Sequence, residues 1–379
     1  MNLAAKNAKC AKKAWPMVRL GDVCEIRAGA THHGIESETG PYPVYGSGGY
    51  ICQATEYRCP ANTVTVGRKG TLDKPLLIEE PFWNIDTCFG VIPNESLDAR
   101  YLWRFCQNFD FYSLIPSIGR PSTNSEAIKL IQIPLPPLSV QREIVARLEK
   151  ELGEADALAA KFKEIAENAD AEFKAELDET FKNVAGEKVK LGDVCEIQRG
   201  GSPRPIKKYL TDAADGLNWI KIGDVAADGK YIVSVEDKIK PSGLNKTRRV
   251  RSGDFLLSNS MSFGRPYILK IDGCIHDGWL VLHGFQDKFT EDYFYYLLRS
   301  SLVQDQFDSL AHGSSVRNLN TGAVSVVEVT QTPIGAQQSI VSKLESAKLK
   351  CEKLKAAAER GLRAAEDLRK SILAEAFEQ

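Results

Sequence analysis

An internal repeat constrains the fold of this chain more than any other feature of its sequence. Residues 18–29 (VRLGDVCEIRAG) recur as residues 189–200 (VKLGDVCEIQRG), with nine of twelve positions identical at an offset of 171. A second match, between residues 137–181 and 333–377, has an offset of 196 and contains no insertion. The sequence therefore predicts two copies of one unit, each with a length-variable part followed by a length-invariant part.

The length-invariant part of each copy predicts a long helix. Apolar residues recur mostly every three or four positions from residue 144 to 181 and from residue 341 to 376. No proline interrupts either stretch, and Pro137 and Pro333 stand where helix starts tolerate proline. About 45 residues that rise about 1.5 Å each form a rod of roughly 65 Å.

A rod with a narrow apolar stripe needs a partner helix. The two predicted helices carry opposite net charges, −5 over residues 136–188 and +2 over residues 333–379, so we expect them to pair with each other. The alternatives for these segments are a four-helix satellite and a disordered charged linker.

The length-variable parts predict two β-rich mixed domains, so the fold class is α+β. Short apolar runs end at turn signals, as in residues 63–66 before 67–70, and residues 254–257 repeat this pattern in the second copy. Helices are expected around residues 97–111 and 292–307. The N-terminal residues 1–17 carry a charge of +4 but lack the apolar core of a secretory signal.

The composition argues against several classes of protein. No run of 18 apolar residues is present, so a transmembrane helix is excluded. Nine cysteines without a Cys-x-x-Cys pair argue against a disulfide framework and a zinc site, and are typical of a reducing cytoplasm. No two of the five histidines stand four residues apart, and His32-His33 is interpreted as a loop or a phosphate contact. Phosphate-binding loops, amino-methyltransferase motifs and nuclease motifs are also missing, which disfavours a solitary enzyme.

Glycine-rich loops with basic or small polar residues occur in both copies. Glycine lets a backbone approach a duplex, while Arg and Lys neutralise phosphates and Arg can read guanine. Because the net charge of the chain is only −1, nucleic acid would have to bind at local patches. The predicted DNA contacts are Ser47, Arg68, Lys69, Arg120 and Ser122 in the first copy, and Arg204, Lys207, Arg248, Arg249, Asn259, Arg265 and Arg317 in the second.

Over nearly its whole length, the chain resembles the specificity subunit of type I restriction–modification enzymes. The resemblance rests on residues 15–23 (WPMVRLGDV) with the repeat at 189–194, on residues 133–145 (IPLPPLSVQREIV) with the degenerate copy at 333–341, and on residues 368–377. The order domain, long helix, domain, long helix is more specific than any one of these motifs. Because the second junction lacks the Pro-Leu-Pro-Pro run, we expect the second helix to start at a different angle.

The resemblance implies a division of the chain into named parts. Residues 1–17 would be an N-terminal extension, 18–136 and 189–332 two target-recognition domains, and 137–188 and 333–379 two long helices. The helices would form an antiparallel coiled coil within an internal pseudo-twofold repeat. Under that symmetry we expect Gly361 to lie opposite Ala155 and close to Gly153, where small residues would let the two backbones approach.

The resemblance also implies a function and its partners. Each recognition domain would read one half of a bipartite double-stranded DNA site, and the helices would space the domains. Two methyltransferase subunits would dock on the chain, and restriction–translocase subunits would join them. S-adenosylmethionine would bind the methyltransferase, so this non-catalytic chain would need no cofactor and no metal. The alternative is a coiled-coil scaffold with two ligand-binding modules, whose binding to DNA would be insensitive to salt and sequence.

Overall fold

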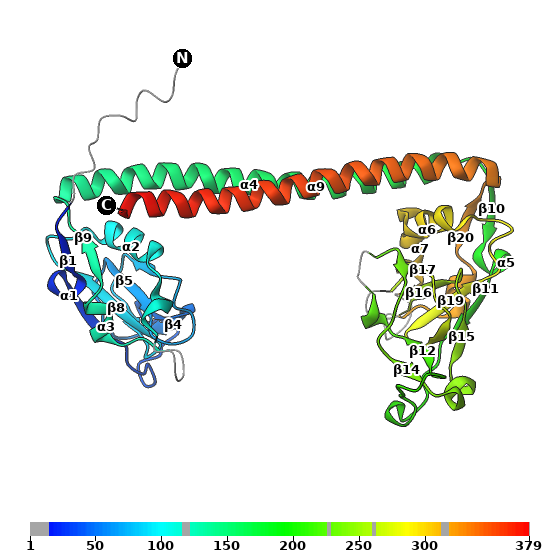
Figure 1. Cartoon of the computed structure of the whole chain (residues 1–379), viewed down its shortest axis with the longest axis horizontal. Helices are drawn as coiled ribbons and strands as arrows, with labels where there is room; N and C mark the ends of the chain where they lie inside the picture. The colour runs from blue at the N-terminus through cyan, green and yellow to red at the C-terminus, as the bar shows by residue number, and fades with distance from the viewer. Residues whose placement is uncertain (1–14, 116–121, 226–228, 260–262, 312–317, 379) are drawn as a thin grey trace, which may run out of the picture. The chain divides into compact units, whose positions relative to one another are not determined.

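The computed structural model describes residues 15–115, 122–225, 229–259, 263–311 and 318–378 (Figure 1). The chain divides into two compact units, Met1–Glu164 with Ala358–Gln379, and Ile165–Ala357. Each unit therefore contains one β-rich domain and one part of each of two long helices, α4 (Leu138–Asn183) and α9 (Ile334–Phe377).

The first unit contains a mixed domain built on an antiparallel sheet of order β2-β8-β5-β6. A smaller sheet has the order β4-β3-β7, and β1 pairs with β9 in a separate ribbon. The elements before α4 are β1 (Met17–Arg19), α1 (Leu20–Val23), β2 (Cys24–Ala28), β3 (Tyr42–Gly46), β4 (Gly49–Ala54), β5 (Thr63–Gly67), β6 (Leu76–Ile78), β7 (Trp83–Asn84), β8 (Cys88–Pro93), α2 (Ala99–Asn108), a 3₁₀ turn (Phe111–Leu114), α3 (Ser125–Lys129) and β9 (Gln132–Pro134).

The second unit repeats this plan with a longer sheet of order β11-β19-β16-β17-β13. A second sheet has the order β14-β12-β18-β15, and β10 pairs with β20. The elements between α4 and α9 are β10 (Glu187–Lys190), α5 (Leu191–Val194), β11 (Glu196–Arg199), β12 (Leu217–Ile220), β13 (Tyr231–Ile232), β14 (Lys238–Ile239), β15 (Arg248–Val250), β16 (Phe255–Ser258), β17 (Pro266–Leu269), β18 (Gly273–Ile275), β19 (Trp279–His283), α6 (Glu291–Arg299), α7 (Ser301–Ala311), α8 (Thr321–Ser325) and β20 (Glu328–Gln331), with 3₁₀ turns at Ile206–Lys208, Ile222–Asp224 and Pro241–Lys246.

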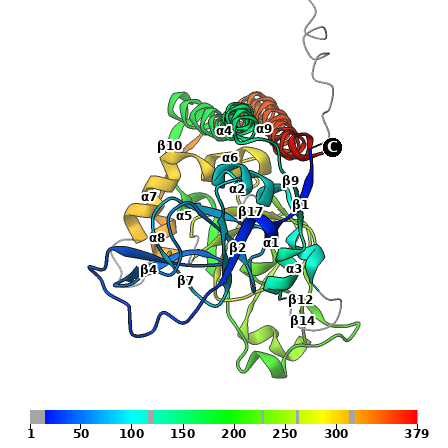
Figure 2. The same cartoon turned by 90° about the vertical axis from the view of Figure 1, so that its left-hand side faces the viewer.

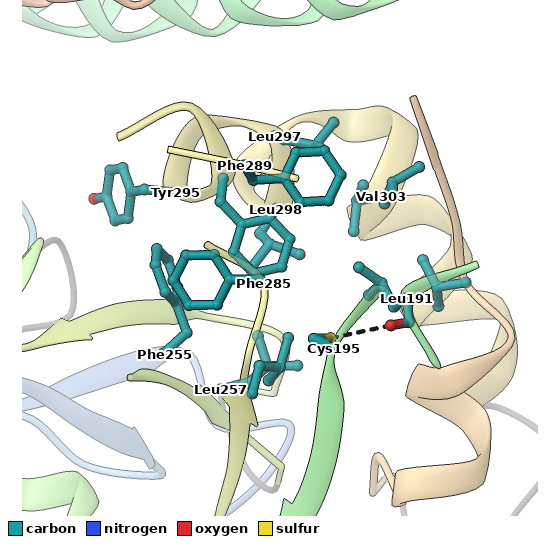
Figure 3. Close-up of a cluster of buried hydrophobic side chains, with 14 of the residues drawn as sticks. Leu191, Cys195, Phe255, Leu257, Phe285, Phe289, Tyr295, Leu297, Leu298 and Val303 are labelled. Carbon is teal, nitrogen blue, oxygen red and sulfur yellow. Dashed lines mark hydrogen bonds between the residues drawn. The ribbon is translucent and has the colours of Figure 1, made fainter. Parts of the chain in front are cut away.

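The repeated sequence forms the same strand–helix–strand corner in both units. Leu20 and Leu191 are fully buried at the start of α1 and α5. The glycines that follow them have no room for a side chain, because a Cβ on Gly21 would overlap Lys129 and a Cβ on Gly192 would overlap Ser325. Figure 3 shows the second corner against the domain core, where the Cys195 Sγ donates a hydrogen bond to the Leu191 carbonyl (3.0 Å).

The helices α4 and α9 lie side by side and run antiparallel in each unit (Figures 1 and 2). In the first unit, the Arg369 Nε lies 3.3 Å from the Asp156 carboxylate. In the second unit, the Lys355 Nζ lies 2.8 Å from the Asp170 carboxylate, and residues further along α4 meet residues earlier in α9. The expected antiparallel pair is therefore confirmed within each unit.

The expected register of the pair is wrong. Gly361 does not face Ala155 but lies against the ring of Phe162, seven residues further along α4. A Cβ at residue 361 would overlap that ring. The glycine therefore makes room for a large side chain, whereas the sequence-based prediction had brought small residues together.

Each helix also ends on an aromatic contact with a domain. Phe377, near the end of α9, packs on Tyr101 of α2 with ring centres 5.3 Å apart. Phe181, at the equivalent place in α4, packs on Tyr293 of α6 at 5.4 Å. Equivalent aromatic residues thus hold the C-terminal end of each long helix against a domain.

Two further expectations concern the helices, and the first of them is wrong. The helix predicted over residues 292–307 is two helices, because Ser300 is extended and the Asp178 carboxylate accepts a hydrogen bond from the Ser301 N–H (2.7 Å). The second long helix has the same hydrogen bond in its first turn as the first, and the expected difference in angle stays a prediction. The Gln141 N–H donates to the Pro137 carbonyl, and the Gln337 N–H donates in the same way to Pro333.

Candidate nucleic-acid interface

In the first unit, the predicted contacts that the structure describes gather around the turn before β8. The Thr87 carbonyl accepts hydrogen bonds from the backbone N–H groups of Arg68 (2.8 Å) and Lys69 (3.2 Å). The Thr87 hydroxyl accepts a third, from the Ser47 N–H (3.1 Å). Lys69 forms a backbone bridge with Ser122. The turn therefore holds Ser47, Arg68 and Lys69, and Ser122 joins them through Lys69.

The cations at this end of the sheet are only weakly neutralised. The Lys69 Nζ lies 3.6 Å from the Asp86 carboxylate, and both side chains are at least half exposed, so the pair contributes about 0–1 kcal/mol. The Arg68 guanidinium lies 5.7 Å from the centre of the Phe89 ring. Its buried Nε has no hydrogen-bond partner among the described residues. A buried donor without a partner is costly, so Arg68 is a candidate for a contact with a bound molecule.

Sequence reasoning missed Arg58 at the same end of the sheet. Its Nε donates to the carbonyl of Ala28, the last residue of β2 (2.9 Å). Its guanidinium also lies 5.8 Å from the centre of the Trp83 ring. No glycine-rich loop surrounds Arg58, so the pattern used to find the other residues had no signal there. We call Ser47, Arg58, Arg68, Lys69 and Ser122 the first loop face.

In the second unit, Asn259 occupies the backbone position that Arg68 occupies in the first. The Asn259 N–H donates to the Gly278 carbonyl (3.0 Å), as Arg68 does to Thr87. The Asn259 carbonyl accepts from the Leu319 N–H (2.9 Å), as Arg68 does from Thr123 (3.0 Å). The two side chains differ in type. Each nevertheless has one buried polar atom without a hydrogen-bond partner among the described residues, Nε in Arg68 and Oδ1 in Asn259.

Asp277 links other residues of the second domain to Asn259. Its backbone carbonyl accepts from the Asn259 Nδ2 (2.8 Å) and from the Arg199 Nε (3.2 Å). Its carboxylate accepts from the Ser202 hydroxyl, which lowers the pKa of Asp277, and lies 3.6 Å from Arg204, whose side chain is 79% exposed.

Arg248 is the counterpart of Arg58. Its Nε donates to the carbonyl of Arg199, the last residue of β11 (3.5 Å). We call Arg199, Arg204, Arg248, Asn259 and Asp277 the second loop face. Sequence reasoning selected three of these five residues and missed Arg199 and Asp277, because it scored loops and not strand ends.

Both loop faces present guanidinium, ammonium or hydroxyl groups at or beside strand ends, whereas the Asn259 amide in the second face is fully buried. Such groups bind phosphate oxygens and base edges. No motif for covalent or acid–base catalysis lies among the residues of either face. The geometry is that of a binding surface, repeated with different side chains.

Comparison with known proteins agrees with this geometry. The type I restriction modification DNA specificity domain matches residues 12–165 and again residues 183–359. The chain belongs to this family of DNA specificity subunits. One curated relative is the putative type I restriction enzyme specificity subunit S.HindORF215P of Haemophilus influenzae, which is 25% identical over 70% of this chain and 68% of the relative.

Two solved structures share the fold of this specificity subunit. One, from work on complex assembly and conformational transition of the type I R-M system, has a TM-score of 0.74 and 20% identity, covering 96% of this chain and 98% of its own. The other is the HsdS subunit from Thermoanaerobacter tengcongensis, with a TM-score of 0.57 and 20% identity over 97% of both chains. The two-domain repeat predicted from the sequence is therefore confirmed.

The family settles the class of function. A type I specificity subunit is not itself an enzyme. It works with DNA and with the modification and restriction subunits of its system. The scaffold with two ligand-binding modules is not favoured. Across the described residues, no helix has a stretch that is long and apolar enough to span a bilayer.

The structure does not bring every predicted contact of the specificity subunit together. Arg120 and Arg317 lie outside the described residues. Lys207 is exposed on the 3₁₀ turn that follows Arg204. Arg249 follows Arg248 on β15, so it points to the opposite face of that strand. Their contacts with DNA stay predictions.

Arg265 is hydrogen-bonded through its backbone to Ser258, the neighbour of Asn259, but its side chain lines a separate hollow. Its exposed side chain lines a hollow of about 620 Å³ between α4, β17 and α7, together with Lys174 and Arg299 and with the acidic residues Asp170 and Asp305. Charges of both signs surround the Arg265 side chain here, and its contact with DNA stays a prediction.

Proposed function

We propose that each domain of this specificity subunit reads one half of a bipartite double-stranded DNA site through its loop face. The equivalence of Arg68 and Asn259 carries this proposal. Both residues use the same backbone hydrogen bonds to a turn, so the scaffold holds them in the same way. The side chains differ, as expected if one scaffold presents different reading groups to two half-sites.

The two side chains have different base preferences. Arg binds the O6 and N7 of guanine in the major groove, and Asn binds the N6 and N7 of adenine. We therefore expect a guanine contact for the first domain. We expect an adenine contact for the second once binding of DNA opens access to the Asn259 side chain, which is fully buried in the free chain. Lys69 and Arg204 have flexible, exposed side chains that suit contacts with phosphates. Contacts with phosphates position a protein on DNA without reading its sequence.

The helices α4 and α9 would space the domains and dock two methyltransferase subunits. Equivalent residues hold each domain to the helix pair: Glu149 of α4 lies 3.4 Å from Arg100, and Glu345 of α9 lies 2.7 Å from Lys230. The internal repeat thus gives the chain two related domain–helix regions, one around Glu149 and one around Glu345. Two related regions support a stoichiometry of two methyltransferase subunits, with restriction–translocase subunits joining them. Native mass spectrometry of the co-expressed complex would measure this ratio.

In this proposal, S-adenosylmethionine belongs to the methyltransferase and this chain contributes no cofactor. The described cysteines are free thiols, which supports work in a reducing compartment. We place the subunit in the cytoplasm, where it would meet chromosomal DNA.

A domain exchange tests the proposed function. Residues 18–136 would be replaced by those of a relative with a different target, and the chimaera would be co-expressed with the methyltransferase of its own system. Mapping of methylated adenines across the genome should show a change in one half of the site only. A change in both halves, or in neither, would contradict independent reading by the two domains. The matched control exchanges residues 189–332 and should alter the other half.

A further inference from the structure

The segment between β2 and β3 is a long loop with an unusual set of side chains. Residues 29–41 contain no helix or strand, only an isolated bridge from Glu36 to Ala54 of β4. The Ser37 N–H donates to the Gln53 carbonyl (3.0 Å), so the loop lies against β4. Loops of this length inside a compact domain usually serve a function.

Three side chains from this loop and strand converge. The His32 Nε2 lies 3.0 Å from a Glu36 carboxylate oxygen. The Cys52 Sγ completes the group, and the three ligand atoms all lie within 4.8 Å of one another. They line an open hollow of about 510 Å³ in the first unit, next to Glu38.

We propose that His32, Glu36 and Cys52 bind a zinc ion. Imidazole, carboxylate and thiolate are the three kinds of side chain that zinc takes as ligands. Calcium and magnesium prefer oxygen ligands alone, so the thiol and imidazole select against them. The fourth position of a tetrahedral ion would face solvent, because the Glu36 side chain is 49% exposed.

The distances suit this ion. With bonds of about 2.0–2.3 Å, neighbouring ligand atoms of a tetrahedral zinc site lie roughly 3.3–3.8 Å apart. The His32 and Glu36 atoms are already at 3.0 Å, so the ion needs them to move apart by only a few tenths of an ångström. Cys52 would have to approach by no more than about 1–1.5 Å, which a loop and an edge strand can allow.

Cys52 distinguishes this site from an ordinary histidine–glutamate ion pair. The other cysteines in the described part of the chain are buried, as expected for small apolar side chains, whereas Cys52 is partly exposed and faces the pair. The His33 Nδ1 lies 3.5 Å from the same Glu36 oxygen, so it can orient that carboxylate as outer partners of metal ligands do. Sequence spacing missed the site because its ligands come from a loop and a strand, without a Cys-x-x-Cys or helical histidine pair.

Bound zinc would attach the 29–41 loop to β4. This inference does not depend on the proposed reading of DNA, because its test measures metal. The full-length chain, freed of any affinity tag and of metal by chelation, would be incubated with zinc, separated from free ion by gel filtration and analysed for metal. We expect close to one zinc ion per wild-type chain.

Matched variants make the test specific. Cys52→Ala and His32→Gln should lose the zinc, whereas Glu38→Gln, which removes a neighbouring carboxylate outside the triad, should retain it. Wild-type chain without retained zinc, or equal retention by Cys52→Ala, would overturn the proposal.

Cobalt provides a second measurement that needs no variant to fold. Cobalt in the wild-type site should give the near-ultraviolet charge-transfer band of a thiolate ligand and the intense visible bands of tetrahedral coordination. Absence of the thiolate band would overturn the assignment of Cys52 as a ligand.

Discussion

Gly361 of α9 lies against the ring of Phe162 of α4, and a Cβ at residue 361 would overlap that ring. Glycine costs a helix interior about 1 kcal/mol relative to alanine, so its presence here needs a compensating reason. Packing of the aromatic ring between the two helices provides it.

We predict that Gly361→Ala destabilises the protein although alanine is the better helix former. Overpacking costs about 1–3 kcal/mol in a well-packed contact, which exceeds the propensity gain. The matched control is Gly153→Ala, because nothing lies within 4 Å of a Cβ at Gly153 and the substitution should stabilise by up to about 1 kcal/mol. Urea unfolding of both variants would measure the difference. Stabilisation by Gly361→Ala would show that Phe162 does not occupy this gap.

This contact also shows where prediction from the sequence reached its limit. The apolar spacing and opposite charges correctly predicted two long helices that pair with each other, because both are properties of residues close in sequence. The predicted register was wrong by seven residues. A shift of seven residues is about two helical turns, so the same apolar face of each helix stays in contact in both registers. Only the three-dimensional fit of Phe162 against Gly361 separates the two registers.

For the loop faces, too, prediction from the sequence was right for some residues and not for others. Glycine-rich segments identified Arg68 and Asn259, which the structure places at equivalent strand ends. The same signal selected Arg265, whose side chain lines a hollow beside α4, because a glycine–arginine pair does not encode which side of a strand a residue faces. Arg58 and Asp277 were missed, since their hydrogen bonds join residues far apart in sequence. Arg58 donates to the carbonyl of Ala28, and the Asp277 carbonyl accepts from Asn259.

Gln141 and Gln337 are buried at the starts of α4 and α9 and make matching hydrogen bonds. The Gln141 Oε1 accepts from the Asp98 N–H (2.8 Å), and its Nε2 donates to the carbonyls of Ser96 (2.9 Å) and Pro136 (2.8 Å). Gln337 makes the same three kinds of bond, at 2.8, 2.8 and 2.9 Å.

We predict that Gln141→Ala and Gln337→Ala each cost at least about 2 kcal/mol of unfolding free energy, because buried backbone groups lose their partners. Gln338→Ala removes an exposed glutamine one residue further along α9 and should change stability by less than about 0.5 kcal/mol. Unfolding curves of the three variants would provide the comparison. Equal effects at residues 337 and 338 would mean that the buried bonds contribute nothing.

Lys230 lies between a carboxylate of α6 in the second domain and a carboxylate of α9, so it links the two elements. Its Nζ lies 2.7 Å from Asp292 and 2.7 Å from Glu345, and its side chain is only 10% exposed. Because the carboxylates are themselves nearly half exposed, we expect Lys230→Met to cost about 1–3 kcal/mol, less than a fully buried pair would. Lys343→Met breaks an exposed pair with Glu176 and should cost less than about 1 kcal/mol.

The effect of Lys230→Met should depend on pH. Burial pushes the pKa of Glu345 upward, but the hydrogen bonds from Lys230 and Tyr296 together with the charges of Lys230 and Lys348 outweigh burial and hold this pKa below its ordinary value of 4.5. A carboxyl group with a lowered pKa stabilises the fold above that ordinary value and loses its contribution as the pH falls through the folded pKa. The stability difference between wild type and Lys230→Met should therefore be largest near about pH 7 and shrink below about pH 4.5. An equal difference in urea titrations at both pH values would rule out an electrostatic origin.

Substitutions in the loop faces should separate base reading from phosphate binding. Arg68→Ala should weaken binding to the target by about 1–3 kcal/mol and relax the specificity at one guanine position of one half-site. Asn259→Ala should do the same at one adenine position of the other half. Lys69→Ala should instead weaken binding to all sequences alike and reduce the salt slope by about one unit. Lys129→Ala, on the exposed end of α3, is the control and should change neither quantity.

The measurement combines salt titrations of DNA binding by the assembled complex with a panel of targets that differ at single positions. The decisive comparison is between Arg68→Ala and Asn259→Ala. The two residues have equivalent backbone hydrogen bonds in the two domains but different side chains. If both variants relaxed positions within the same half-site, the two loop faces would not serve separate halves. If neither altered specificity while Lys69→Ala altered affinity, the strand ends would hold the DNA backbone and the base reading would lie elsewhere in the two domains.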